Sequence, residues 1–212
     1  NLLLDVTKPK EKFERIFGIV APHAGYVYSG KTAAHAYNLL LGKKFKTVVI
    51  ISPSHSEYFP GICVFEGDAY ETPLGLLKVD KELRENLVTN DNVIFKGYEG
   101  HRREHALEVQ LPFLQSVLQD FKIVPVVMGD QSKRNIDALA KKLAELADDE
   151  TLIVASSDLS HFYSKSQADK LDSVVEKRVR EFDFDSLQFD LENHACEACG
   201  GGPIVTLMKA AN

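Results

Sequence analysis

The sequence predicts an α/β fold with a mostly parallel central sheet. Short apolar runs rich in Val and Ile, a pattern typical of buried strands, alternate with stretches of helical spacing along the chain. The clearest pair of runs is residues 17–20 and 46–51, with a helix expected between them over residues 29–41, capped by Ser29. Because a strand–helix–strand unit is right-handed, we expect these two strands to be parallel neighbours.

The remaining elements follow from the same patterns. Asp80 is placed to cap a helix, Pro112 to interrupt one, and Pro203 to sit in the first turn of the last helix. Pro125 lies inside an apolar run and predicts an edge strand or a bulge. We expect further strands at 62–65, 76–79, 93–95, 121–128 and 151–156, and further helices at 81–88, 104–118, 135–146, 167–182 and 183–194. Residues 66–75 should form a loop or an edge feature, and residues 1–15 a helix or a lead-in segment. We expect one domain over residues 1–212.

The composition narrows the classes of partner. A net charge of -6 without a long basic block argues against nucleic acid. No apolar run reaches the roughly 20 residues that a membrane-spanning helix needs, and the start of the chain lacks the layout of a signal peptide. Three cysteines are too few for a disulfide framework. We therefore expect a cytoplasmic protein that binds neither nucleic acid nor membrane.

Reactive side chains follow three of the predicted strands. His23 follows the first strand, His55 the second, and Asp158 and His161 the strand at 151–156. Because parallel strands end at one edge of a sheet, these residues should meet there. Imidazole and carboxylate together suit iron, zinc, copper or manganese, and an uncoordinated His161 could act as a general acid or base. The alternative for each histidine alone is a structural hydrogen bond at a strand end.

Cys199 lies directly before Gly200 and Gly201, where the last helix should begin. A helix N-terminus favours the thiolate, so Cys199 could be a soft metal ligand or a nucleophile, and the glycines would let a ligand approach the backbone. The alternative is a buried structural cysteine beside a loop that needs glycine. Cys196 completes a C-x-x-C pair, but no second pair exists to form a zinc site.

Several further residues are candidates for the lining of a pocket. His105 and Glu108 share a helix face and could place a carboxylate beside a metal-ligating histidine. The alternative is an exposed polar face. Tyr26 and Ser54 lie in the two histidine loops, whereas His101 is expected to be solvated. The sequence contains no P-loop, G-x-G-x-x-G or G-x-S-x-G, so nucleotide binding and α/β-hydrolase chemistry lack their usual support.

Six segments in order, APHAGYVYSG, SPSH, YETPLG, EHALEVQLPF, SSDLSH and CGGGP, resemble the Memo family (mediator of ErbB2-driven cell motility). Its prokaryotic members are called AmmeMemoRadiSam system protein B. The family is similar in fold to class III extradiol dioxygenases, which are non-haem iron enzymes with two histidines and a glutamate. The resemblance therefore implies a three-layer α/β/α sandwich with a mostly parallel or mixed sheet. A G-x-F-Y-P-like start and a final strand, both usual in the family, are missing from this sequence, which suggests a trimmed family domain.

By motif, the resemblance implies a metal site of His23, His55 and Cys199, with cysteine where the dioxygenases have glutamate. It places Asp158 and His161 in the same pocket, with His161 similar to the dioxygenase acid/base histidine. Family members are linked to copper or iron and to redox activity, and the animal member is also linked to phosphotyrosine peptides bound in the same cleft.

Three functions remain open at this point. The first is a metal-dependent redox protein or dioxygenase-like enzyme that uses iron or copper. The second is a binding module, with or without metal, whose cleft takes a small molecule or a peptide and whose glycine loop binds an anion. The third is a zinc-dependent hydrolase.

Overall fold

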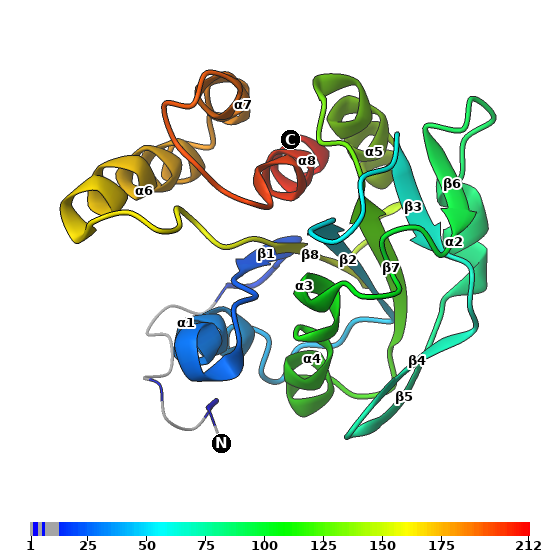
Figure 1. Cartoon of the computed structure of the whole chain (residues 1–212). Coiled ribbons are helices and arrows are strands. Elements are labelled where there is room, and N and C mark those ends of the chain that lie inside the picture. The colour runs from blue at the N-terminus through cyan, green and yellow to red at the C-terminus, as the bar shows by residue number, and fades with distance from the viewer. Residues whose placement is uncertain (1, 4–5, 7–12) are drawn as a thin grey trace.

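The computed structural model describes residues 2–3, 6 and 13–212 and shows an α/β fold built on a six-stranded mixed sheet (Figure 1). The six strands are β1 (Gly18–Ala21), β2 (Thr47–Pro53), β3 (Ile62–Phe65), β6 (Ile94–Gly97), β7 (Lys122–Met128) and β8 (Thr151–Ser156). Their order is β1-β8-β2-β7-β3-β6. The first four in this order are parallel, β3 is antiparallel to β7, and β6 is parallel to β3. Most of the predicted lead-in at 1–15 lies outside the described residues.

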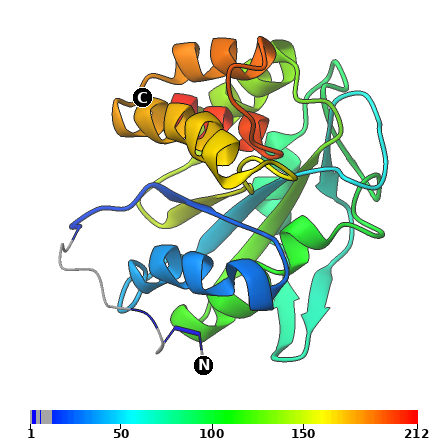
Figure 2. The same cartoon turned by 60° about the vertical axis from the view of Figure 1, so that its left-hand side comes forward.

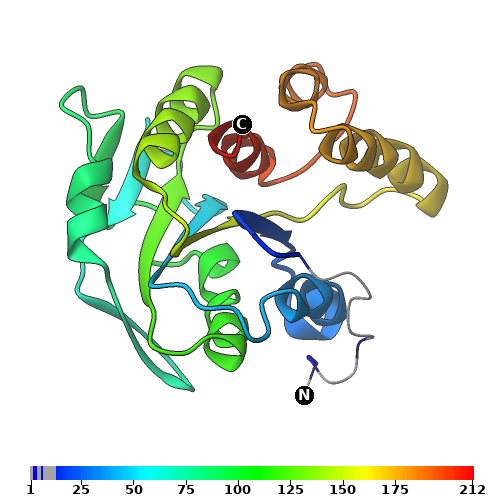
Figure 3. The same cartoon turned by 180° about the vertical axis from the view of Figure 1, so that it is seen from behind.

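Helices cover both faces of the sheet, which confirms the predicted three-layer sandwich (Figures 2 and 3). Side chains alternate along β2: Val48 and Ile50 join the core on one face, and Val49 and Ile51 join the core on the other. One face carries α1 (Tyr26–Asn38), α3 (His105–Glu108) and α4 (Leu111–Val117), and the other carries α2 (Lys81–Leu87), α5 (Lys133–Leu146), α6 (Lys165–Arg180), α7 (Phe184–Glu192) and α8 (Gly201–Ala210). Among these described helices, none is both long enough and apolar enough to cross a membrane.

The prediction that the first two strands are adjacent in the sheet is wrong, because β8 lies between β1 and β2. The crossover through α1 fixes the parallel direction of these strands, but it leaves room for a strand to enter between them. β8 suits that place because all of its residues are buried. The three strands still end at one edge of the sheet, as the site requires.

The predicted edge position of Pro125 is also wrong, because β7 lies between β2 and β3. β7 pairs with β2 along its whole length, whereas its ladder with β3 covers only residues 126–128. The next pairing on that side is an isolated bridge between Val79 and Ile123. Pro125, which has no N–H to donate, therefore lies in a gap between two pairings, where a central strand tolerates it.

Two local predictions differ from the structure. Ser29 does not cap α1, since the helix begins at Tyr26 after Gly25, and the Ser29 hydroxyl donates to the Ala24 carbonyl (2.8 Å). Residues 66–75, expected to be a loop or an edge feature, contain β4 (Ala69–Thr72), which forms a separate hairpin with β5 (Gly75–Lys78). Asp80 caps α2, and Pro112 lies in the first turn of α4, so it marks the boundary with α3, as predicted.

His101 is not solvated, contrary to the prediction. Tyr70 Oη lies 2.8 Å from its Nδ1, and its Nε2 lies 3.2 Å from the Cys63 carbonyl. The phenol donates to Nδ1 and the ring donates from Nε2, so the neutral imidazole satisfies both contacts. Burial lowers the pKa of His101 to about 4.

We predict that His101 makes folding sensitive to acid. Because its pKa is lower in the folded than in the unfolded chain, the stability it contributes is complete above about pH 6.5 and is lost as the pH falls toward 4, by up to about 3 kcal/mol. Urea unfolding at neutral and acid pH should show a smaller acid loss in His101→Gln than in the parent chain. His35→Asn, at an exposed position of α1, should keep the full loss. Equal acid losses in all three proteins would contradict the prediction.

Candidate metal centre

The carboxyl edge of the sheet brings together His23, His55 and Cys199. His23 follows β1, His55 follows β2, and Cys199 lies in the loop that leads into α8. One ligand atom from each of these side chains lies within 4.8 Å of the other two. The His23 and His55 rings meet edge to face, with centroids 5.0 Å apart. Three segments far apart in the sequence therefore supply two imidazoles and one thiol to a single point.

His23 is held by a buried chain of polar side chains. Ser156 Oγ donates to the Ala106 carbonyl (2.6 Å) and accepts from Gln110 Nε2 (2.8 Å). Its remaining lone pair faces His23 Nδ1 at 2.8 Å, so that nitrogen carries the proton. Gln110 is fixed in turn by Tyr37, whose hydroxyl donates to Oε1 (2.7 Å). This arrangement leaves His23 Nε2 facing Cys199 Sγ at 3.1 Å.

His55 is oriented by the carboxylate of Glu104, the residue that caps α3. Glu104 accepts from His55 Nδ1 (2.9 Å) and from the His55 backbone N–H (2.6 Å). Glu104 also accepts from the Ala106 N–H (2.9 Å), which caps α3. Burial alone would raise the pKa of this carboxyl, but its hydrogen bonds with His55 outweigh burial and lower the pKa. With Nδ1 held by Glu104, His55 presents Nε2 to the centre.

The sulfur of Cys199 lies against two imidazoles and one backbone N–H group. Burial by itself would raise its pKa, but hydrogen bonds with His23 and His55 prevail and lower the pKa to about 6. The Asp158 backbone N–H also donates to Sγ (3.2 Å). Hydrogen bonds to Cys199 and Glu104 raise the pKa of His55 to about 10. At neutral pH the protein without metal therefore holds a thiolate beside a protonated His55.

The donor set fits a transition metal. Thiolate and imidazole are ligands for copper, zinc and iron. Each imidazole has one nitrogen tied to the protein and the other aimed at the centre, as metal-ligating histidines usually have. A metal cation could take the place of the proton that His55 holds beside the Cys199 thiolate. His23, His55 and Cys199 would hold the ion.

Asp158 and His161 lie beside this centre. The backbone N–H groups of His23 and Ala24 donate to Asp158 Oδ1 (2.8 and 3.3 Å). The other oxygen, Oδ2, lies 3.7 Å from His161 Nε2, beyond a hydrogen bond but within ion-pair distance. His161 is 44% exposed, so its ring faces both Asp158 and solvent.

The other candidate pocket residues divide into two groups. His105 lies at the centre, its ring 5.3 Å from the His55 ring and 5.8 Å from the His23 ring, and it forms a second potential ligand group with His55 and Glu104. Three side chains have other surroundings. Glu108 is exposed on α3, the Tyr26 hydroxyl donates to the Val109 carbonyl (3.1 Å), and the Ser54 hydroxyl donates to the Glu57 carbonyl.

The glycines after Cys199 allow close packing of protein against protein. A Cβ on Gly200 would lie 2.1 Å from the Ser156 carbonyl oxygen, and one on Gly201 would lie 2.7 Å from Leu191. Their backbone N–H groups already donate to the protein, Gly200 to Ser157 Oγ (3.0 Å) and Gly201 to the Ala198 carbonyl (3.0 Å). A ligand that approached this backbone, as predicted, would therefore find no free N–H donor at either glycine.

Comparison with known proteins places the chain in a family. The sequence profile of Memo-like proteins matches residues 1–212. The chain belongs to the Memo family. A MEMO1 family protein of Methanobrevibacter smithii is 38% identical over 194 residues, which cover 90% of this chain and 69% of that protein. MEMO1 family proteins of Thermoplasma volcanium (38% over 195 residues; 92% and 72%) and Nitrosopumilus maritimus (36% over 199 residues; 93% and 72%) are similarly related.

In this Memo-family chain, sequence reasoning missed Glu104, Gln110 and Ser156 as parts of the site. All three are buried polar residues, a class that needs hydrogen-bond partners. Ser156 ends a strand just before Asp158, which is the one local signal available. Glu104 and Gln110 reach the centre only because α3 packs against β2.

We predict that Glu104→Gln weakens metal binding by about 10- to 100-fold, the range usual for partners of metal-ligating histidines. The amide can still accept from the His55 N–H, but it lacks the charge that stabilises the ring. Titration against a competing chelator would measure the loss. Glu108→Gln, an exposed change on the same helix, should leave the affinity unaltered. Equal metal affinities for the Glu104 variant and the parent chain would show that Glu104 does not support metal binding.

We also predict that metal affinity rises with pH. Binding must displace a proton from His55, whose pKa is about 10, while Cys199, with a pKa of about 6, is already a thiolate. Between pH 7 and 9 the apparent affinity should therefore rise by up to about tenfold per pH unit. Calorimetry in buffers of different ionisation enthalpy would count the released protons. A flat pH profile without proton release would contradict this prediction.

Proposed function

We propose that this Memo-family protein is a metal-dependent redox protein in which His23, His55 and Cys199 bind iron or copper. The convergence of their three ligand atoms within 4.8 Å carries this proposal. A purely structural cysteine would not need two imidazoles beside it. Here each histidine is also held by its own buried partner, His23 by Ser156 and His55 by Glu104.

The thiolate influences which metal the centre prefers. Non-haem iron oxygenases commonly use two histidines and one carboxylate, and a thiolate in place of the carboxylate shifts preference toward softer ions such as copper(I). When bound, iron or copper supplies one-electron chemistry and a position for dioxygen or substrate. The proposal is therefore redox chemistry in general, and it does not extend to ring cleavage.

The surrounding residues have separate roles in this proposal. Asp158 joins the histidine loop to the cysteine loop, because it accepts from the His23 N–H while its own N–H donates to Cys199 Sγ. His161, half exposed and 3.7 Å from Asp158 Oδ2, is placed to carry protons between solvent and the centre. His105 stacks on the His55 ring, with the ring centroids 5.3 Å apart.

The phosphopeptide alternative is less well supported. An anion at the start of α8 would need free backbone N–H groups, yet Gly200, Gly201 and Gly202 donate to Ser157 Oγ, the Ala198 carbonyl and Gln131 Oε1. We therefore do not propose an anion-binding module.

Oxygen consumption tests the redox proposal. The protein, loaded with iron(II) or copper(I), is mixed with a reducing substrate, a catechol among others, in an oxygen electrode. We expect the parent chain to consume oxygen faster than the His23→Ala variant treated in the same way. His161→Gln should keep its metal content but consume oxygen more slowly than the parent chain, at a rate that depends on pH. Rates equal to the His23→Ala rate for every substrate and metal would reject redox turnover.

A further inference from the structure

We propose that the cleft beside Cys199 recognises an organic cation with an apolar body, such as a primary ammonium compound. The cleft has a volume of about 340 Å³, within the size range of small-molecule sites. As the recognition site for the substrate of the metal centre, it rests on the proposed function. The binding preference itself follows from the lining of the cleft.

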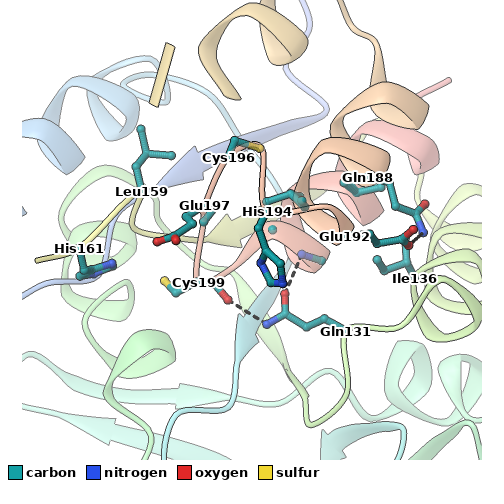
Figure 4. Close-up of a pocket in the computed structure, with 15 residues that line it drawn as sticks. Gln131, Ile136, Leu159, His161, Gln188, Glu192, His194, Cys196, Glu197 and Cys199 are labelled. Carbon is teal, nitrogen blue, oxygen red and sulfur yellow. Dashed lines mark hydrogen bonds between the residues drawn. The ribbon is translucent and has the colours of Figure 1, made fainter. Parts of the chain in front are cut away.

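Of the three proposed metal ligands, Cys199 alone lines the cleft, which extends from there to α7. Cys199 and His161 border it, so a molecule bound there would reach the thiolate side of the centre. Figure 4 shows Cys199 and Glu197 toward one side of the cleft, and Glu192 with Gln188 toward the other. Apolar side chains supply the body of the lining: Ile136, Leu159, Leu191 and Val205. A ligand with an apolar body would bury surface against Leu159 and Leu191, whereas Ile136 and Val205 are already buried from solvent.

The charged groups of the lining are acidic. Among the residues that the structure describes, the lining has two carboxylates, Glu192 and Glu197, and neither lysine nor arginine. The nearby cation of Lys209 is already bound, with Nζ 2.7 Å from Asp137 Oδ1 and 2.9 Å from Gln188 Oε1. The cleft therefore favours a positive ligand over a negative one.

Each carboxylate is oriented through one of its oxygens. Gln188 Nε2 donates to Glu192 Oε1 (2.8 Å), and the Tyr163 hydroxyl donates to Glu197 Oε1. One oxygen of each group is thus held in place, while the other can accept from a ligand N–H. An ammonium group has three N–H donors, so it can donate to the free oxygen of either carboxylate.

The backbone at the start of α8 does not offset this preference. Gly202 N–H donates to Gln131 Oε1 (2.7 Å), and Gln131 Nε2 donates to the Cys199 carbonyl (2.8 Å). Gln131 thus closes the end of the helix and braces the cysteine loop. A phosphate in the cleft would meet two carboxylates and no free N–H of Gly200, Gly201 or Gly202.

A matched series of three probes tests the inference on metal-free protein. Benzylammonium, benzyl alcohol and benzylphosphonate share one apolar body and differ in charge. At about pH 8, where a primary ammonium is charged, ligand-observed NMR gives the affinities. Shifts of the Ile136 and Val205 methyl signals, with Ile50 as a remote reference, place the ligand. Benzylammonium should bind most tightly, in the millimolar range expected for a ligand of this size.

Variants with the same net charge complete the test. Glu192→Gln/Glu197→Gln should weaken benzylammonium binding by about tenfold, whereas Glu176→Gln/Glu181→Gln, on exposed positions of α6 and its end, should not. Tighter binding of the alcohol or phosphonate, equal loss in both variants, or no saturable benzylammonium binding would overturn the inference. Because no metal is present, cation binding without metal uptake would reject the proposed function alone, and metal uptake without cation binding would reject this inference alone.

Discussion

Cys199→Ser is expected to lower the copper(I) affinity of the protein by more than about 100-fold, beyond the effect usual for partners of ligating histidines. The hydroxyl that replaces the thiol is a hard, neutral group, and copper(I) prefers soft anionic sulfur. The two histidines alone remain in the set of converging ligand atoms. Competition with a copper(I) chelator under anaerobic conditions measures the change.

Cys196→Ser is the control for this prediction. Cys196 lies three residues earlier, is buried in the core, and has its pKa raised to about 11 by burial, so it is expected to stay a neutral thiol. Its loss should leave the metal affinity unchanged, with unfolding curves used to confirm that both variants fold. Similar affinities for the Cys199 variant and the parent chain would exclude the thiolate from the centre. A loss in the Cys196 variant would instead support a C-x-x-C site.

Gly200→Ala is expected to destabilise the fold by about 3 kcal/mol, the upper part of the range for overpacking in a core. The new Cβ would lie 2.1 Å from the Ser156 carbonyl oxygen and 2.7 Å from Ser157 Cβ, so backbone must move. That movement would displace Cys199 from the end of β8 and also disturb Ser156, which holds His23. Stability and metal affinity should therefore fall together.

Gly25→Ala provides the matched comparison. Gly25 precedes α1 in the other loop of the site, and the nearest atom to an added Cβ is 3.7 Å away, an ordinary contact. Urea unfolding should show a change within about 0.5 kcal/mol for this variant. If Gly200→Ala were as stable as Gly25→Ala, the tight packing of the cysteine loop on β8 would be wrong.

Much of the fold was predictable because local patterns decide it. The apolar run of β2 and the amphipathic pattern of α5 agree with their environments, and Asp80 caps its helix by a local bond. The place of β8 was not predictable in this way. Its pairing with β1 and β2 depends on which apolar strand fills the space between them, and that is a long-range packing choice.

The residues of the site show the same difference between local and long-range determinants. His23 and His55 stand directly after strands, so their positions follow from the topology of the sheet. Glu104 could not be assigned from sequence, because its link to His55 joins loops that only the packed fold brings together. The same holds for Gln110, whose amide reaches Ser156 through the core between α3 and β8.

Metal content is the most direct test of the centre. The protein is purified without oxygen beside the variant His23→Ala/His55→Ala/Cys199→Ala, and both are analysed for iron, copper and zinc as isolated and after metal titration. Stoichiometric iron or copper in the parent chain, lost in the variant, is the predicted result. Zinc alone would point to hydrolytic chemistry in place of redox chemistry. Absence of metal uptake by the parent chain, or equal uptake by the variant, would contradict the metal centre itself.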